Sequence, residues 1–159
     1  TPSPREREAS PQSTRGKAKI AIDRSHAGMR LGDNDSSLRS SRGWMNTYND
    51  EFGLTLYSNL SGLPRGGKSL TVAYFGGRLL MVLMTYRESE FGQWQGGVDA
   101  TDKKYGPGNS DGHSTSSWTD DQTYLEIKKD SPGNVQAKIL DLSLRREWIQ
   151  RSGRDLPKF

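Results

Sequence analysis

The chain of 159 residues contains no cysteine, only two histidines and few hydrophobic residues, which make up 31% of the total. Without cysteine the chain can form neither a disulfide framework nor a thiolate zinc site. His26 and His113 lie in separate polar regions, so they do not suggest a shared metal site. The longest apolar run, residues 79–84, is far shorter than the ~20 residues of a membrane-spanning helix. We therefore expect no metal, no cofactor and no membrane-spanning helix.

Glycine and proline are abundant by contrast, with 18 and 7 residues respectively. Frequent turn residues favour short strands over long helices, and the length suits one domain. The strongest local signal is the hairpin predicted over residues 69–86. Its two apolar runs are separated by Gly76-Gly77, a pair that adopts the positive φ of a tight hairpin turn. The second run, residues 79–84, is apolar at every position, which predicts a central strand covered on both faces.

Further alternating segments complete the pattern. We predict a strand at 52–58 and a second hairpin formed by 123–129 and 135–143. Residues 144–151 can form a short helix, with Gly153 as its stop. Between the two hairpins we expect a bulged segment at 94–99 and a long polar loop at 100–121. The fold prediction is all-β: an antiparallel β-sandwich or flattened barrel of about 6–8 short strands, with a short C-terminal helix and an extended N-terminal arm.

The net charge of +4 resides in the N-terminal segment. Residues 1–42 form a basic, Ser/Pro/Arg-rich arm predicted to be largely irregular, and residues 43–159 form the β-sandwich domain with no net charge. One functional hypothesis is therefore a coat or assembly protein of a virion, whose arm contacts neighbouring subunits or nucleic acid. Such an arm also allows self-association into an oligomer. Its contact residues would be Arg5, Arg7, Arg15, Lys17, Lys19, Arg39 and Arg42.

Aromatic residues beside the Gly-rich connections support a different hypothesis, which we prefer. Exposed rings on loops stack on sugar faces or lie at a lipid headgroup boundary. The sequence then predicts a non-enzymatic module that docks a glycan or a lipid headgroup at a membrane surface. The candidate ligand-binding residues are Phe91, Trp94, Tyr105 and Trp118. The alternative for each ring is burial at the end of the sandwich. Because the chain begins at Thr1, we expect a processed, secreted or extracellular protein.

Residues 62–69 match the P-loop pattern GxxxxGK[ST] and provide a third hypothesis, nucleotide hydrolysis. Lys68 would then reach the terminal phosphates and Ser69 would hold Mg²⁺. A P-loop must open a helix whose N-terminus faces the phosphates. The residues after Ser69 are instead β-branched and are interrupted by Gly76-Gly77. A turn-forming loop is therefore the preferred interpretation of this motif.

Overall fold

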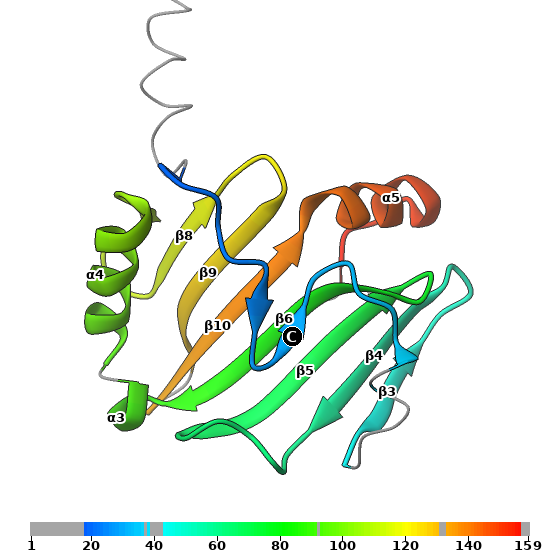
Figure 1. Ribbon diagram of the computed structural model, residues 1–159, viewed down its shortest axis with the longest axis horizontal. Coiled ribbons are helices and arrows are strands. Elements are labelled where there is room, and N and C mark those ends of the chain that lie inside the picture. The colour runs from blue at the N-terminus through cyan, green and yellow to red at the C-terminus, as the bar shows by residue number, and fades with distance from the viewer. Residues whose placement is uncertain (1–17, 37, 39–42, 92, 131–132, 157–159) are drawn as a thin grey trace, which may run out of the picture.

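The computed structural model describes residues 18–36, 38, 43–91, 93–130 and 133–156, and these form a mostly β protein. Eight antiparallel strands make one unclosed sheet, across which the N-terminal segment runs (Figure 1). The strands, in their order across the sheet, are β3 (Met45–Asn49), β4 (Leu54–Asn59), β5 (Gly67–Phe75), β6 (Arg78–Arg87), β10 (Asn134–Asp141), β9 (Thr123–Asp130), β8 (Thr115–Thr119) and β7 (Asn109–Ser110). The prediction of an antiparallel all-β fold is confirmed.

The predicted hairpin is the centre of this sheet. β5 and β6 pair through Gly76 and Gly77, whose φ angles of 58° and 77° are both positive, as a tight hairpin turn requires. β6 lies between β5 and β10, so both of its edges are hydrogen-bonded. Its residues from Leu79 to Met84 are all buried. The uninterrupted apolar run is thus explained by a strand with neighbours on both edges and packing on both faces.

One face of the sheet, which we call the covered face, carries most of the core. On β10 the covered face receives Val135, Ala137 and Ile139, all buried. The N-terminal segment forms a two-stranded sheet of β1 (Ser25–His26) and β2 (Met29–Arg30) over this side of the molecule. The segment adds three buried residues to the core clusters: Ile22, Leu31 and Leu38. The described part of segment 1–42 therefore belongs to the packed body, and residue 43 does not mark the edge of the core.

A helix is found where the sequence predicted a bulged segment and the start of a polar loop. After the short helix α3 (Glu88–Phe91), helix α4 spans Trp94–Tyr105 and lies at one end of the sheet (Figure 1). The predictions for 94–99 and for the loop from residue 100 are wrong. The physical reason is burial, because Trp94, Val98 and Tyr105 share a helical face that packs with Ile127 and Trp118. This packing outweighs the helix cost of Gly96-Gly97.

The C-terminal helix α5 (Leu142–Ser152) is confirmed and packs on the opposite side of the sheet, which we call the open face. The carboxylate of Asp141 caps it by accepting the backbone N–H of Leu144 at 2.9 Å. Gly153 ends it in the left-handed conformation, with φ of 73°. Leu144 and Trp148 are buried against the β4, β5 and β6 side chains. Among the described residues no helix has the length and apolar character needed to cross a membrane.

Candidate functional site

Away from α5, the open face carries polar and charged side chains that are only partly buried. On β10 the half-buried Gln136 and Lys138 alternate with the buried residues of the covered face. Their partners on β9 are Lys128 and Glu126 respectively. Strand alternation therefore places one side of β9 and β10 in contact with solvent, although the strands lie near the middle of the sheet.

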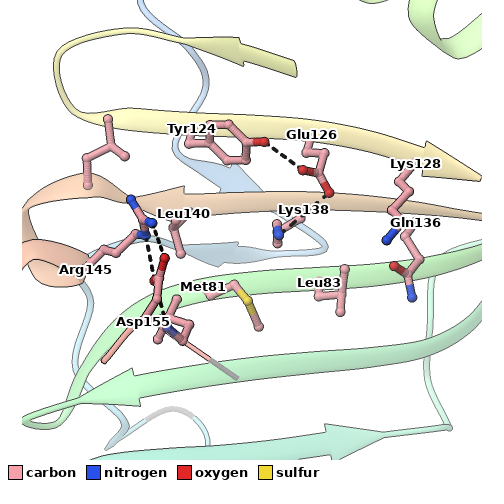
Figure 2. Close-up of a pocket in the computed structure, with 12 residues that line it drawn as sticks. Met81, Leu83, Tyr124, Glu126, Lys128, Gln136, Lys138, Leu140, Arg145 and Asp155 are labelled. Atoms are coloured by element: carbon pink, nitrogen blue, oxygen red, sulfur yellow. Dashed lines mark hydrogen bonds and ion pairs between the residues drawn. The ribbon is translucent and has the colours of Figure 1, made fainter. Parts of the chain in front are cut away.

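A pocket of about 580 Å³ is hollowed into this open face beside α5, and Figure 2 shows its lining. Strands β6, β9 and β10 form its floor and one wall, and α5 with the segment after it forms the other wall. The lining residues are Met81, Leu83, Tyr124, Glu126, Lys128, Gln136, Lys138, Leu140, Leu142, Arg145, Asp155 and Leu156. Its volume lies within the range of small-molecule binding pockets.

The floor of the pocket is apolar. Met81 and Leu83 come from β6, and Leu140 lies directly across from Met81 on β10. Leu142 and Leu156 extend the apolar surface under α5 and the C-terminal segment. The same residues on the sheet belong to the core cluster below α5, so the floor is held rigidly by packing.

Three charged or polar side chains form a connected wall over β9 and β10. The hydroxyl of Tyr124 donates to Glu126 Oε2 at 2.7 Å, and Glu126 Oε1 lies 3.7 Å from Lys138 Nζ. Lys138 also lies over the Tyr124 ring, 5.9 Å from its centroid. Burial raises the pKa of Tyr124, and the hydrogen bond to Glu126 raises it further. The phenol therefore stays protonated at neutral pH and acts as a hydrogen-bond donor.

The opposite wall contains a two-bond ion pair between Arg145 and Asp155. Arg145 Nε donates to Asp155 Oδ1 at 3.2 Å, and Nη2 donates to Oδ2 at 2.5 Å. These hydrogen bonds lower the pKa of Asp155 below its ordinary value. The side chain of Asp155 remains 57% exposed, and that of Arg145 is 35% exposed. The pair lies at the mouth of the pocket, within reach of solvent.

This arrangement suits the recognition of an amphipathic anion. Lys128, Lys138 and Arg145 outnumber the two carboxylates of the lining, and an apolar floor lies directly beside them. In the described part of the chain, the lining carries no thiol, imidazole or aliphatic hydroxyl group. Within the same ranges no group of three or more His, Asp or Glu residues gathers where it could hold a metal ion.

The aromatic residues predicted as the ligand site are placed elsewhere. Trp94, Tyr105 and Trp118 are brought together, but in the core cluster between α4 and the sheet, where each is at most 4% exposed. The indole N–H of Trp94 donates to the carbonyl of Ile127 at 3.1 Å. The exposure that the prediction required is therefore wrong for these three rings, because α4 buries them. The side chain of Phe91 lies outside the described residues.

The other sequence hypotheses involve regions away from the pocket. Of the predicted arm contacts, only Lys19 is described, and it is exposed. Arg5, Arg7, Arg15, Lys17, Arg39 and Arg42 lie outside the described residues. The P-loop pattern at 62–69 leads into β5, with Ser69 inside the strand. As the sequence predicted, no helix N-terminus follows the motif in this described region.

The pocket residues were not predicted from the sequence, although β9 contained a usable signal. Tyr124, Glu126 and Lys128 occupy alternate positions of a predicted strand, and such polar alternation marks a face in contact with water. Arg145 and Asp155 carry no comparable signal, since they meet only because Gly153 ends α5 and turns the chain back.

The fold and the pocket together define the class: an antiparallel β protein whose large sheet is covered on one face and carries a pocket on the other. Comparison of the chain with protein-family models, with curated proteins and with solved structures finds no match. The function is therefore inferred from the geometry of the site.

Proposed function

We propose that this protein is a non-enzymatic binding module that docks an anionic lipid-type ligand in the pocket on its open face. The observation that carries the proposal is the apolar floor of Met81, Leu83 and Leu140 lying beside Lys138 and Arg145. Apolar surface beside basic side chains suits a ligand that has an acyl chain and an anionic headgroup. The chain gains by leaving water, and the headgroup gains from charge-assisted hydrogen bonds.

The lining favours a lipid headgroup over a glycan, the other ligand that the sequence suggested. A sugar face commonly stacks on an exposed aromatic ring. Among the described residues that line the pocket, Tyr124 is the single aromatic one. Its ring is half-buried and its hydroxyl is hydrogen-bonded to Glu126, so it offers little free face for a sugar. Binding is also favoured over catalysis, because Glu126 and Asp155 are already engaged with cations and the phenol of Tyr124 is held protonated.

The first experiment measures binding of 11-(dansylamino)undecanoic acid by its fluorescence increase. Gln136→Trp should weaken binding severely, because a large side chain on the pocket lining occupies the ligand volume. Thr115→Trp is the matched control: it lies directly across from Lys128 on the same face but outside the lining. If both variants weaken probe binding equally, or if neither variant weakens it, the assignment of this pocket is wrong.

A second experiment compares sources of the ligand. Flotation with phosphatidylcholine vesicles, with and without phosphatidylserine, tests docking to an anionic membrane surface. A glycan array tests the sugar alternative. The lipid proposal is wrong if the unmodified protein binds a neutral glycan but not the dansyl probe, and if Gln136→Trp abolishes the glycan binding.

A further inference from the structure

We infer that the ligand headgroup is a carboxylate that binds Arg145, and that Asp155 occupies this position in the free protein. The inference rests on the proposed function and deepens it, because it assigns the chemical class of the headgroup. The protein shows how a carboxylate can bind there, because the Asp155 carboxylate is paired with the guanidinium of Arg145 at the pocket mouth (Figure 2).

The two partners of this ion pair are held very differently. Arg145 lies in the first turn of α5, and its neighbour Leu144 is 2% exposed. That turn is also fixed by the Asp141 cap. Asp155 follows Gly153, beyond the end of the helix, and its side chain is 57% exposed. The guanidinium is thus a preorganised part of the site, whereas the Asp155 carboxylate is mostly exposed and is held otherwise by the backbone N–H of Leu156 at 2.7 Å.

The geometry of the pair defines what can replace Asp155. Two N–H groups of Arg145, Nε and Nη2, point to the two oxygens of one carboxylate. A ligand carboxylate can take over both hydrogen bonds, so the exchange leaves the number of charges at the site unchanged. Asp155 then returns to water. This costs little because an exposed ion pair contributes only about 0–1 kcal/mol to stability.

The position of the pair relative to the floor orients the rest of the ligand. Met81 and Leu140 lie next to Arg145 and Asp155 in the pocket, and Leu142 and Leu156 flank the pair along the chain. A carboxylate on Arg145 therefore directs its acyl chain over the apolar floor. Lys138 adds a favourable positive charge to the pocket. This charge also contributes to lowering the pKa of Asp155.

The test uses the dansylundecanoic acid probe and its methyl ester, which has the same chain without the charge. Asp155→Asn should tighten binding of the acid about two- to fivefold, the range expected for removing one exposed competing ion pair, and leave the ester unchanged. Arg145→Gln should weaken the acid and leave the ester unchanged. Arg146→Gln is the matched control, since Arg146 is an exposed neighbour on α5 outside the pocket lining.

Each other result overturns a defined part of the inference. If Asp155→Asn weakens the acid, or tightens acid and ester alike, Asp155 does not compete with the headgroup. If Arg145→Gln affects neither probe while Gln136→Trp still blocks both, the pocket binds the chain but Arg145 is not the anchor. If neither probe binds the unmodified protein, the proposed function itself fails. Competition by dodecyl phosphate at lower concentration than dodecanoate would reassign the headgroup to phosphate.

Discussion

The guanidinium of Arg24 donates to the carboxylate of Asp141, although the two residues are far apart in the sequence. Arg24 also donates to Thr123 Oγ1 at 3.0 Å, and the other oxygen of Asp141 caps α5. One carboxylate thereby joins the N-terminal segment on the covered face to the helix that forms the pocket wall.

This dual role predicts a graded response to substitution. Asp141→Ala removes the helix cap and leaves Arg24 poorly compensated, so we expect a loss of about 2–4 kcal/mol in the free energy of unfolding. Asp141→Asn keeps an oxygen that can cap the helix and should cost clearly less. Urea denaturation measures both variants. Equal losses would mean that the cap contributes nothing and that the ion pair alone matters.

His26 should make stability depend on pH. Its ring accepts or donates a 3.0 Å hydrogen bond with the Tyr86 hydroxyl, and burial lowers the pKa of His26 below 6.5, with a smaller opposing effect from Asp23. The unfolded chain then binds a proton more readily than the folded one. Stability should be full above pH 6.5 and should fall as the pH decreases through the lowered pKa.

Urea denaturation between pH 7.5 and 5 checks this dependence. His26→Gln should flatten the curve, because it removes the titrating group. His113→Gln serves as the control, since His113 lies in an exposed turn with 80% of its side chain exposed. If the pH dependence persists in His26→Gln but vanishes in His113→Gln, it comes from His113 and the prediction for His26 is wrong.

Two glycines should respond to alanine in opposite directions. A Cβ at Gly108 would lie 2.7 Å from Cε2 of the fully buried Trp118 and 2.9 Å from the carbonyl of Ser117. Gly108→Ala should therefore destabilise by about 1–3 kcal/mol through overpacking. Gly96 lies inside α4 with no atom in the way, so Gly96→Ala should stabilise by about 1 kcal/mol. Thermal unfolding compares them, and a stabilising Gly108→Ala would contradict the close contact.

Burial of the aromatic cluster should be visible in tryptophan fluorescence. Trp94, Trp118 and Trp148 are each at most 3% exposed, and Trp44 is half-buried. Acrylamide should therefore quench little of the native emission, and the Trp44→Phe variant should be quenched even less. Strong quenching in Trp44→Phe would show that at least one of the three rings reaches solvent, as the sequence had suggested for Trp94 and Trp118.

Elements with a strong local pattern were predictable from the sequence. The Gly76-Gly77 turn, the paired strands around it and the helix stop at Gly153 depend on neighbouring residues, so local chemistry decides them. Helix α4 was missed because Gly96-Gly97 weakens its local signal, while its stability comes from contacts with β9. The same contacts bury Trp94 and Trp118, so the location of the aromatic rings was wrong for the same reason.

The sequence by itself determined an antiparallel β protein with a central apolar hairpin and a short C-terminal helix, because strand alternation and turn residues act over short distances. Only the tertiary structure decided which face of the sheet stays open and which side chains meet there. Tyr124, Arg145 and Asp155 come together because β9 pairs with β10 and α5 folds back over the sheet. Such long-range placement follows from packing the whole chain, which no local pattern records.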